Sequence, residues 1–223
     1  MVPFKFLFFI PFFCSLLLVV SCEDSSNDNP SWKTIFEDNF DRADGSIGSN
    51  WSVDPCLNAT MSVSNNQLLY TSTSASNDNL GSTYVNIISS SKTRIVIKVR
   101  TGANADMIEF AGFGFVPNEN SDIFYLLAVN KTYLALEKNK FSTSETLILD
   151  SKNVSLDNNT DYYLEYIVDG SSFCGYLKDS SGLIISQVTK EDLSYSSWYI
   201  GFCAGSYGPT SFSVDDFKIE IYK

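Results

Sequence analysis

The stretch Phe36-Glu-Asp-Asn-Phe-Asp-Arg-Ala-Asp-Gly-Ser-Ile-Gly-Ser-Asn-Trp51 decides how this chain folds. It begins as a strand, because Phe36, Asp38 and Phe40 fall on one face at a period of two residues. Positions 41 to 50 then supply Asp, Gly, Ser and Asn, which tolerate tight turns. Trp51 closes the loop, so the stretch predicts a strand that enters a turn.

The chain beyond this stretch is a succession of short alternating runs separated by turn residues, which is typical of an all-β sandwich. In the run 93–100, one face carries Ile95, Ile97 and Val99 and the other is mostly charged, which predicts one wet face. Gly112 and Gly114 interrupt an aromatic run and predict a bulge or the close approach of another backbone. We expect about 13 strands, no long helix, and at most one helical turn at 190–196. The predicted fold is all-β, a two-sheet antiparallel jelly-roll sandwich with adjacent terminal strands.

A second motif lies in the last predicted strand, 211–222, where the sequence reads Val214-Asp-Asp-Phe-Lys-Ile219. With the opening stretch, it resembles the concanavalin A-like lectin/glucanase and laminin-G-like jelly-roll domains. Many of these begin with Phe-x-Asp-x-Phe-x-Arg-x-Asp-Gly and close with Val-Asp-Asp/Asn-Phe. The resemblance covers residues 33 to 223, and it implies a concanavalin A-like fold while leaving the ligand open.

The first 21 residues have the pattern of an export signal: Lys5, an apolar run from 6 to 20, and Val-Val-Ser directly before Cys22. This pattern resembles a bacterial lipoprotein signal, so we expect residues 1–21 to be removed and Cys22 to carry lipid. The alternative is an uncleaved transmembrane anchor, although the run is shorter than the roughly 20 residues that a span needs.

Residues 22–31 are acidic and polar, and predict a flexible tether before a single domain at 32–223. Acidic residues directly after the lipidated cysteine resemble the surface-export signal of Bacteroidota lipoproteins. The expected location is therefore the outer membrane, with the domain exposed at the cell surface and the lipid as its only membrane contact. The alternative is a solvated linker that carries no address.

Composition excludes several functions. The chain carries 26 acidic and 15 basic residues, and this acidic balance disfavours nucleic acid, which needs clustered positive charge. It contains no His, so neither a Ser-His-Asp triad nor a Cys/His zinc site can form. Outside the signal and the lipidation site, Cys56, Cys174 and Cys203 remain. One disulfide plus a free thiol, or three free thiols, are both compatible with this number.

Carboxylates can serve as catalytic groups and as metal ligands. Glycoside hydrolysis usually needs two carboxylates across a sugar site, whereas Glu109, Glu137 and Glu165 each stand alone in their predicted strands. The Glu-x-Asp-x-x-Glu run of glucanases of this fold class is missing. Calcium is a possible structural ion, because the predicted end strands bring together a set of hard oxygen ligands: Asp38, Asp41, Asp44, Asp215 and Asp216. Alternatively, Asp41 and Asp44 satisfy turn amides and Asp216 pairs with Arg42.

Twelve Tyr, seventeen Phe and three Trp supply many flat faces, most of which a β sandwich needs for its core. We assign Trp51 and Phe217 to the core. Trp198 and Tyr207 border loops rich in Ser and Gly, and are the candidate ligand contacts.

These observations favour a surface-anchored, non-catalytic lipoprotein that binds glycan or glycoconjugate through a lectin-like sandwich. Two alternatives stay open: an interaction subunit that contacts another surface protein, and a glycoside hydrolase or lyase with an atypical carboxylate site.

Overall fold

The computed structural model describes residues 30–53, 56–75, 79–88, 92–116, 123–140, 143, 145–192 and 199–223. The signal at 1–21, Cys22, most of the tether and Trp198 lie outside the described residues. The described part forms fifteen strands and one short 3-10 helix, η1 (Ala105–Met107). No helix in this part is long and apolar enough to cross a membrane.

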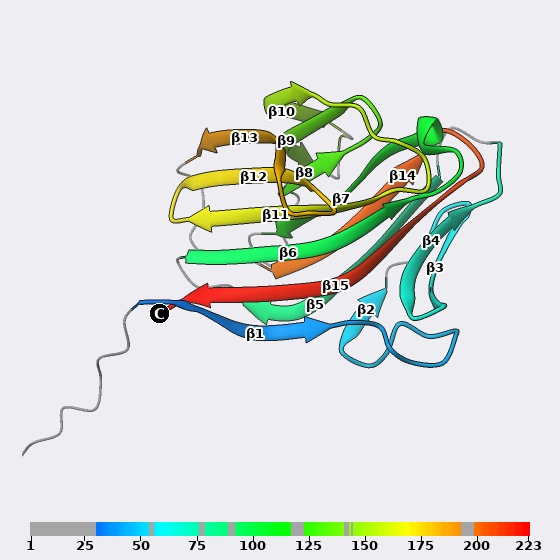
Figure 1. The fold of residues 1–223 in the computed structure, drawn as a ribbon, viewed down its shortest axis with the longest axis horizontal. Coiled ribbons are helices and arrows are strands. Elements are labelled where there is room, and N and C mark those ends of the chain that lie inside the picture. The colour runs from blue at the N-terminus through cyan, green and yellow to red at the C-terminus, as the bar shows by residue number, and fades with distance from the viewer. Residues whose placement is uncertain are drawn as a thin grey trace, which may run out of the picture.

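The strands form two antiparallel sheets that pack face to face (Figure 1). In sheet A the order is β13-β12-β11-β6-β15-β4-β3, and β1 also pairs with β15. Its strands are β1 (Trp32–Asp38), β3 (Ala59–Ser64), β4 (Gln67–Ser72), β6 (Lys92–Thr101), β11 (Asp161–Asp169), β12 (Ser172–Asp179), β13 (Ile184–Glu191) and β15 (Thr210–Tyr222).

Sheet B has the order β10-β9-β8-β7-β14-β5-β2. Its strands are β2 (Trp51–Val53), β5 (Asn79–Ile88), β7 (Ile108–Val116), β8 (Ile123–Val129), β9 (Tyr133–Lys140), β10 (Glu145–Asn153) and β14 (Tyr199–Ser206). The two-sheet antiparallel jelly-roll sandwich predicted from the sequence is therefore confirmed.

The core lies between the sheets and is built by the period-two alternation of the strands. In β6, Ile95, Ile97 and Val99 are at most 1 % exposed, while the residues between them reach solvent on the outward face. Leu164 and Val168 of β11 and Phe173 of β12 join them in one cluster. The predicted wet face of 93–100 is thus confirmed.

The opening stretch folds around Asp38. β1 ends at this residue, and Phe40 then adopts a positive φ of 55°. The buried Asp38 carboxylate accepts hydrogen bonds from the Phe40 amide at 2.8 Å and from Trp51 Nε1 at 2.7 Å. It also pairs with the Arg42 guanidinium, so the suggestion that Arg42 pairs with Asp216 is wrong.

Trp51 and Phe217 lie in the core, as predicted, with ring centroids 5.0 Å apart. They bring the opening motif against the closing one, because β1 and β15 pair with Asp38 opposite Phe217. The predicted adjacency of the terminal strands is confirmed.

The two termini of the described chain leave the sandwich at one end (Figure 1). The Ser31 amide donates to the Lys223 carbonyl at 2.7 Å, and the Lys223 amide returns a bond of 3.1 Å. We call this the tether end. The opposite end, called the far end, contains η1, the β8–β9 turn at 130–132 and the β14–β15 connection at 207–209. The two ends are about 40 Å apart, because the 13 residues of β15 span the distance at about 3.3 Å each.

Three local predictions had different outcomes. The close approach expected at Gly112 and Gly114 is confirmed, because a Cβ atom there would collide with the carbonyl oxygens of Leu127 and Tyr125 on β8. The helical turn suggested at 190–196 is wrong at its start, since β13 continues to Glu191, and 193–198 lie outside the described residues. The strand β2 was not predicted, because three residues are too few to show alternation.

Candidate functional site

The outward face of sheet B combines burial with polar groups. In β8 and β9 the core takes Tyr125, Leu127, Val129, Leu134 and Leu136. The alternate residues therefore point away from sheet A. These outward residues are nevertheless buried, at 0–8 % exposure: Leu126, Ala128, Ala135, Glu137 and Asn139. Outward side chains that are buried must be covered by other protein groups, so this part of sheet B is not a flat solvated face.

Small residues form the floor of this face. One line of neighbours across β9, β8, β7 and β14 reads Ala135, Ala128, Gly112 and Cys203. The next line reads Glu137, Leu126, Gly114 and Gly201. The two β7 glycines have no side chains and are buried, and Glu137 stands at the β9 end of the second line.

Glu137 and Asn139 are held in place by hydrogen bonds. The Asn139 amide donates from Nδ2 to Glu137 Oε2 at 3.3 Å, and Thr146 Oγ1 of β10 donates to Asn139 Oδ1 at 2.5 Å. Glu137 is 6 % exposed. Among the outward side chains that the structure describes on sheet B, it is the single carboxylate. A fixed carboxylate of this kind can accept a hydrogen bond from a hydroxyl group.

The negative charge of Glu137 affects the pKa of the Cys203 thiol. Protein atoms crowd the Cys203 sulfur although the residue keeps some exposed surface, and this burial raises the pKa of the thiol to about 12, with a further contribution from the Glu137 carboxylate. The thiol therefore stays neutral at pH 7 and is a poor nucleophile. In the described part of the chain Cys56, Cys174 and Cys203 form no disulfide, which agrees with the second of the two alternatives left by the sequence.

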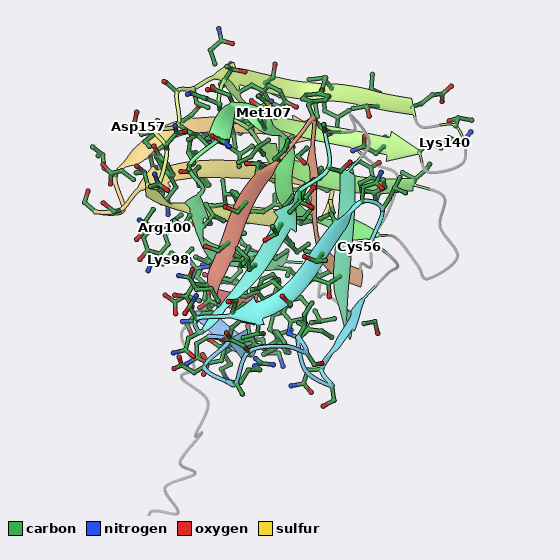
Figure 2. All side chains as sticks on the ribbon, turned by 90° about the vertical axis from the view of Figure 1, so that its right-hand side faces the viewer. Cys56, Lys98, Arg100, Met107, Lys140 and Asp157 are labelled. Atoms are coloured by element: carbon green, nitrogen blue, oxygen red, sulfur yellow. The ribbon has the colours of Figure 1, made fainter. Side chains whose placement is uncertain are left out.

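Aromatic and charged groups lie at the far end of the molecule, where β7 begins and β14 ends. Tyr207, one of the predicted contacts, follows β14 and is 51 % exposed. The Tyr207 amide donates to the Met107 carbonyl at 2.9 Å. Asp106, which precedes Met107 in the chain, pairs with Lys131 at 2.8 Å. Tyr133 starts β9 on the outward side, three strands and about 14 Å from β14. Figure 2, which looks at the far end, labels Met107 on this rim.

The five carboxylates proposed for calcium are not gathered into one site. Asp38 is occupied by Arg42 and two N–H donors, as described above, and Asp44 Oδ1 accepts from the Asn65 amide at 2.9 Å. In the described part of the chain no group of three acidic or cysteine residues could hold a metal ion. Calcium therefore stays a prediction without geometric support.

The other three carboxylates lie closer together. Burial raises the pKa of Asp215, and the charges of Asp216 and Asp41 raise it further, although Lys98 Nζ lies 3.8 Å away and opposes the shift. Asp41 accepts from the Asn39 side-chain amide at 2.8 Å. The alternative role is therefore confirmed for Asp44, which accepts from a turn amide of the β3–β4 hairpin, whereas the bond to Asp41 comes from the Asn39 side chain.

Sequence reasoning named Tyr207 but missed the role of Glu137, Asn139 and Tyr133. The signal available was the concentration of Gly and Ala at alternate positions of the runs 111–114 and 201–205. Trp198, the second predicted contact, cannot be compared because it lies outside the described residues.

No protein-family model matches the chain. The curated proteins likewise give no match.

The solved structures give matches over most of the chain at low sequence identity. Winged bean acidic lectin in complex with methyl-α-D-galactose has a TM-score of 0.62 at 8 % identity, and the match covers 86 % of this chain and 100 % of the lectin. The CBM2 module of the evolved Dit protein of Lactobacillus casei BL23 phage J-1 has a TM-score of 0.61 at 12 % identity, covering 86 % and 97 %.

A protein described among the endo-acting O-glycanases of the human gut microbiota has a TM-score of 0.60 at 12 % identity, covering 86 % and 100 %. Both binding proteins and a glycanase thus share this architecture, so the likeness establishes fold rather than activity. The chain shares the two-sheet jelly-roll sandwich of these solved structures.

Proposed function

We propose that the outward face of sheet B binds a glycan. The observation that carries this proposal is the buried, hydrogen-bonded pair of Glu137 and Asn139 at the border of a floor made of Gly, Ala and Cys. At the border of this floor the polar pair supplies an acceptor and an amide for the hydroxyl groups of a sugar. Tyr207 supplies an exposed ring on which the apolar face of a sugar can stack.

We further infer that the chain binds without cleaving. Glycoside hydrolysis by the usual mechanisms needs two carboxylates about 5 to 10 Å apart. The described outward face of sheet B offers Glu137 alone, with a neutral amide and a neutral thiol beside it. Solved neighbours described as a lectin and a carbohydrate-binding module agree with a binding role, whereas the glycanase neighbour keeps catalysis as the alternative.

The position of the two ends agrees with surface display. A chain anchored through Cys22 would hold the domain by its tether end, because Ser31 lies beside Lys223. Tyr207 and its rim are about 40 Å away, at the far end. A glycan that contacts Tyr207 would be held at the end of the domain remote from the proposed anchor, whereas Glu137 and Asn139 lie toward the other end of β9.

Substitutions on the sheet B face should weaken glycan retention and leave folding unchanged. We expect Glu137→Gln to lower the affinity about tenfold, because a hydrogen bond to a charged acceptor is worth roughly 1.5–3 kcal/mol. Tyr207→Ala should have an effect of similar size through loss of stacking. Affinity electrophoresis of residues 31–223, which contain all described strands and the whole core, through a panel of polysaccharides measures retention.

Tyr222→Ala is the matched control, because Tyr222 is 40 % exposed but lies at the tether end. Unchanged retention of both sheet B variants would place the site elsewhere. Failure of the unsubstituted protein to be retained by any glycan would favour the protein-interaction alternative. New reducing ends above a no-protein control would contradict the non-catalytic role.

Anchoring is tested separately in the full chain. Cys22→Ala should abolish incorporation of labelled fatty acid and release the protein from membranes, since the lipid is proposed to be its only membrane contact. Cys14→Ala, inside the signal, serves as the control and should leave labelling intact. If Cys22→Ala stays membrane-bound without label, residues 1–21 act as an uncleaved anchor.

A further inference from the structure

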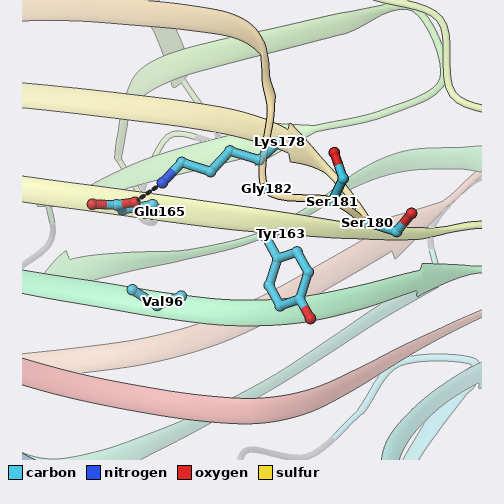
Figure 3. A pocket seen from close by; sticks show the side chains of 7 residues that line it. All are labelled: Val96, Tyr163, Glu165, Lys178, Ser180, Ser181 and Gly182. Carbon is cyan, nitrogen blue, oxygen red and sulfur yellow. Dashed lines mark hydrogen bonds and ion pairs between the residues drawn. The ribbon is translucent and has the colours of Figure 1, made fainter.

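Sheet A carries a pocket on its own outward face, on the opposite side of the sandwich from Glu137. Its volume is about 330 Å³, at the lower end of the range found for small-molecule sites. Three strands and one turn supply the lining (Figure 3): Val96 of β6, Tyr163 and Glu165 of β11, Lys178 of β12, and Ser180, Ser181 and Gly182 of the β12–β13 turn.

One side of the pocket is apolar. Tyr163 and Val96 occupy outward positions on neighbouring strands, because their register partners are Lys98 and Glu165, respectively. Both side chains are only half-buried. An aromatic ring beside an aliphatic side chain gives a platform of the size of a single sugar ring, and aromatic faces bind the C–H face of such rings.

The other side is a fixed ion pair. Glu165 is 7 % exposed, its carboxylate bonds to Lys178 Nζ, and Arg94 Nη1 lies 3.7 Å away. Arg94 is itself held by Glu220 at 2.7 Å and lies over the Trp32 ring at 4.5 Å. Sequence reasoning treated Glu165 as an isolated carboxylate, but the fold sets it in a network that holds its orientation. An acceptor and a donor thus stand side by side at the pocket wall.

The turn that closes the pocket is also rigid. Asp179 Oδ1 accepts from the Ser181 amide at 2.9 Å, from the Ser181 hydroxyl at 2.6 Å and from the Leu183 amide at 3.0 Å. Gly182 takes a positive φ of 86°, which this turn requires. Because the turn is already ordered, a ligand that contacts it would lose little free energy in fixing it.

We propose that this pocket is a second glycan site that takes one neutral monosaccharide unit, stacked on Tyr163 and hydrogen-bonded through its hydroxyl groups to Glu165 and Lys178. A neutral ligand is favoured because a charged one would compete with the Glu165–Lys178 pair, and the buried Glu165 carboxylate would then lose this partner. The ligand class rests on the proposed function of sheet B. With one site on each sheet, the domain is bivalent and can bridge two glycan chains or grip one at two points.

Chemical-shift mapping tests the second site. Labelled residues 31–223 are titrated with the methyl glycosides of galactose, glucose and N-acetylglucosamine. We expect at least one sugar to shift the amides of Tyr163, Lys178 and Gly182. Tyr163→Ala should weaken that response about tenfold, whereas Tyr163→Phe, which keeps the ring, should preserve it. Ser180→Leu, at an exposed turn position, should obstruct the pocket without touching the core, so it serves if Tyr163→Ala does not fold.

The proposals for the two sites can be tested independently of each other. Glu137→Gln and Tyr207→Ala should leave the sheet A response unchanged, because those residues belong to the other sheet. Shifts confined to sheet B would overturn the second site and support the first. The second site would also be overturned if no sugar shifted the amides around the pocket. The same holds if both Tyr163→Ala and Ser180→Leu left the response unchanged. Neither outcome depends on whether sheet B retains polysaccharide.

Discussion

Deleting residues 211–223 should abolish folding of the domain. This segment is nearly all of β15, which lies inside sheet A and pairs with β6, β4 and β1. Its inward side chains are buried at 0–7 % exposure: Phe212, Val214, Phe217, Ile219 and Ile221. Each contributes about 2 kcal/mol through burial, and together they match the roughly 5–15 kcal/mol by which a domain of this kind is stable.

The measurement is circular dichroism with a thermal melt. The deleted protein should show no cooperative transition, because the loss also leaves β1, β4 and β6 with unpaired edges. Removing only Tyr222 and Lys223 is the control, since both are exposed, and this shorter deletion should keep a cooperative melt. If the protein without 211–223 melts like the parent, β15 is peripheral to the stability of the sandwich.

The fold could be predicted because its main determinant is local. Period-two alternation in segments such as 93–100 depends only on neighbouring residues, and the buried side of β6 is the one predicted. The opening and closing motifs also predicted that β1 and β15 are neighbours. The strand β2 was not predicted from the sequence, because three residues show no periodicity. They are ordered by pairing with β5, which lies further along the chain.

The candidate sites depend on long-range register, which alternation does not encode. In the sequence, Glu137 is an isolated acidic residue of its strand. In the structure, the register of the sheet places Gly114 of β7 and Gly201 of β14 in one line with it. Glu165 acquires its pocket in the same way, from β6 and the β12–β13 turn. The surroundings of both carboxylates could not be predicted, because they come from strands that are distant in sequence.

Asp38 shows a different kind of error. The sequence groups it with four other aspartates as a calcium ligand, because the predicted end strands are neighbours. In the structure it is 8 % exposed, and its three donors come from within 13 residues of the chain: the Phe40 amide, the Arg42 guanidinium and the Trp51 indole. A carboxylate that satisfies these groups fixes the irregular backbone after β1. The carboxylate therefore has a structural role.

Asp38→Ala should lower the free energy of unfolding by about 3 kcal/mol, because it leaves the half-buried Arg42 charge and the buried Trp51 N–H without their acceptor. Trp51→Phe removes one of these bonds and should cost less, about 1–2 kcal/mol. Urea denaturation of residues 31–223 gives both values. Asp41→Ala, at an exposed neighbouring position, is the matched control and should change stability by less than about 0.5 kcal/mol. If Asp38→Ala proves as mild as this control, the carboxylate does not organise the opening loop, and its position next to Arg42 is incidental to folding.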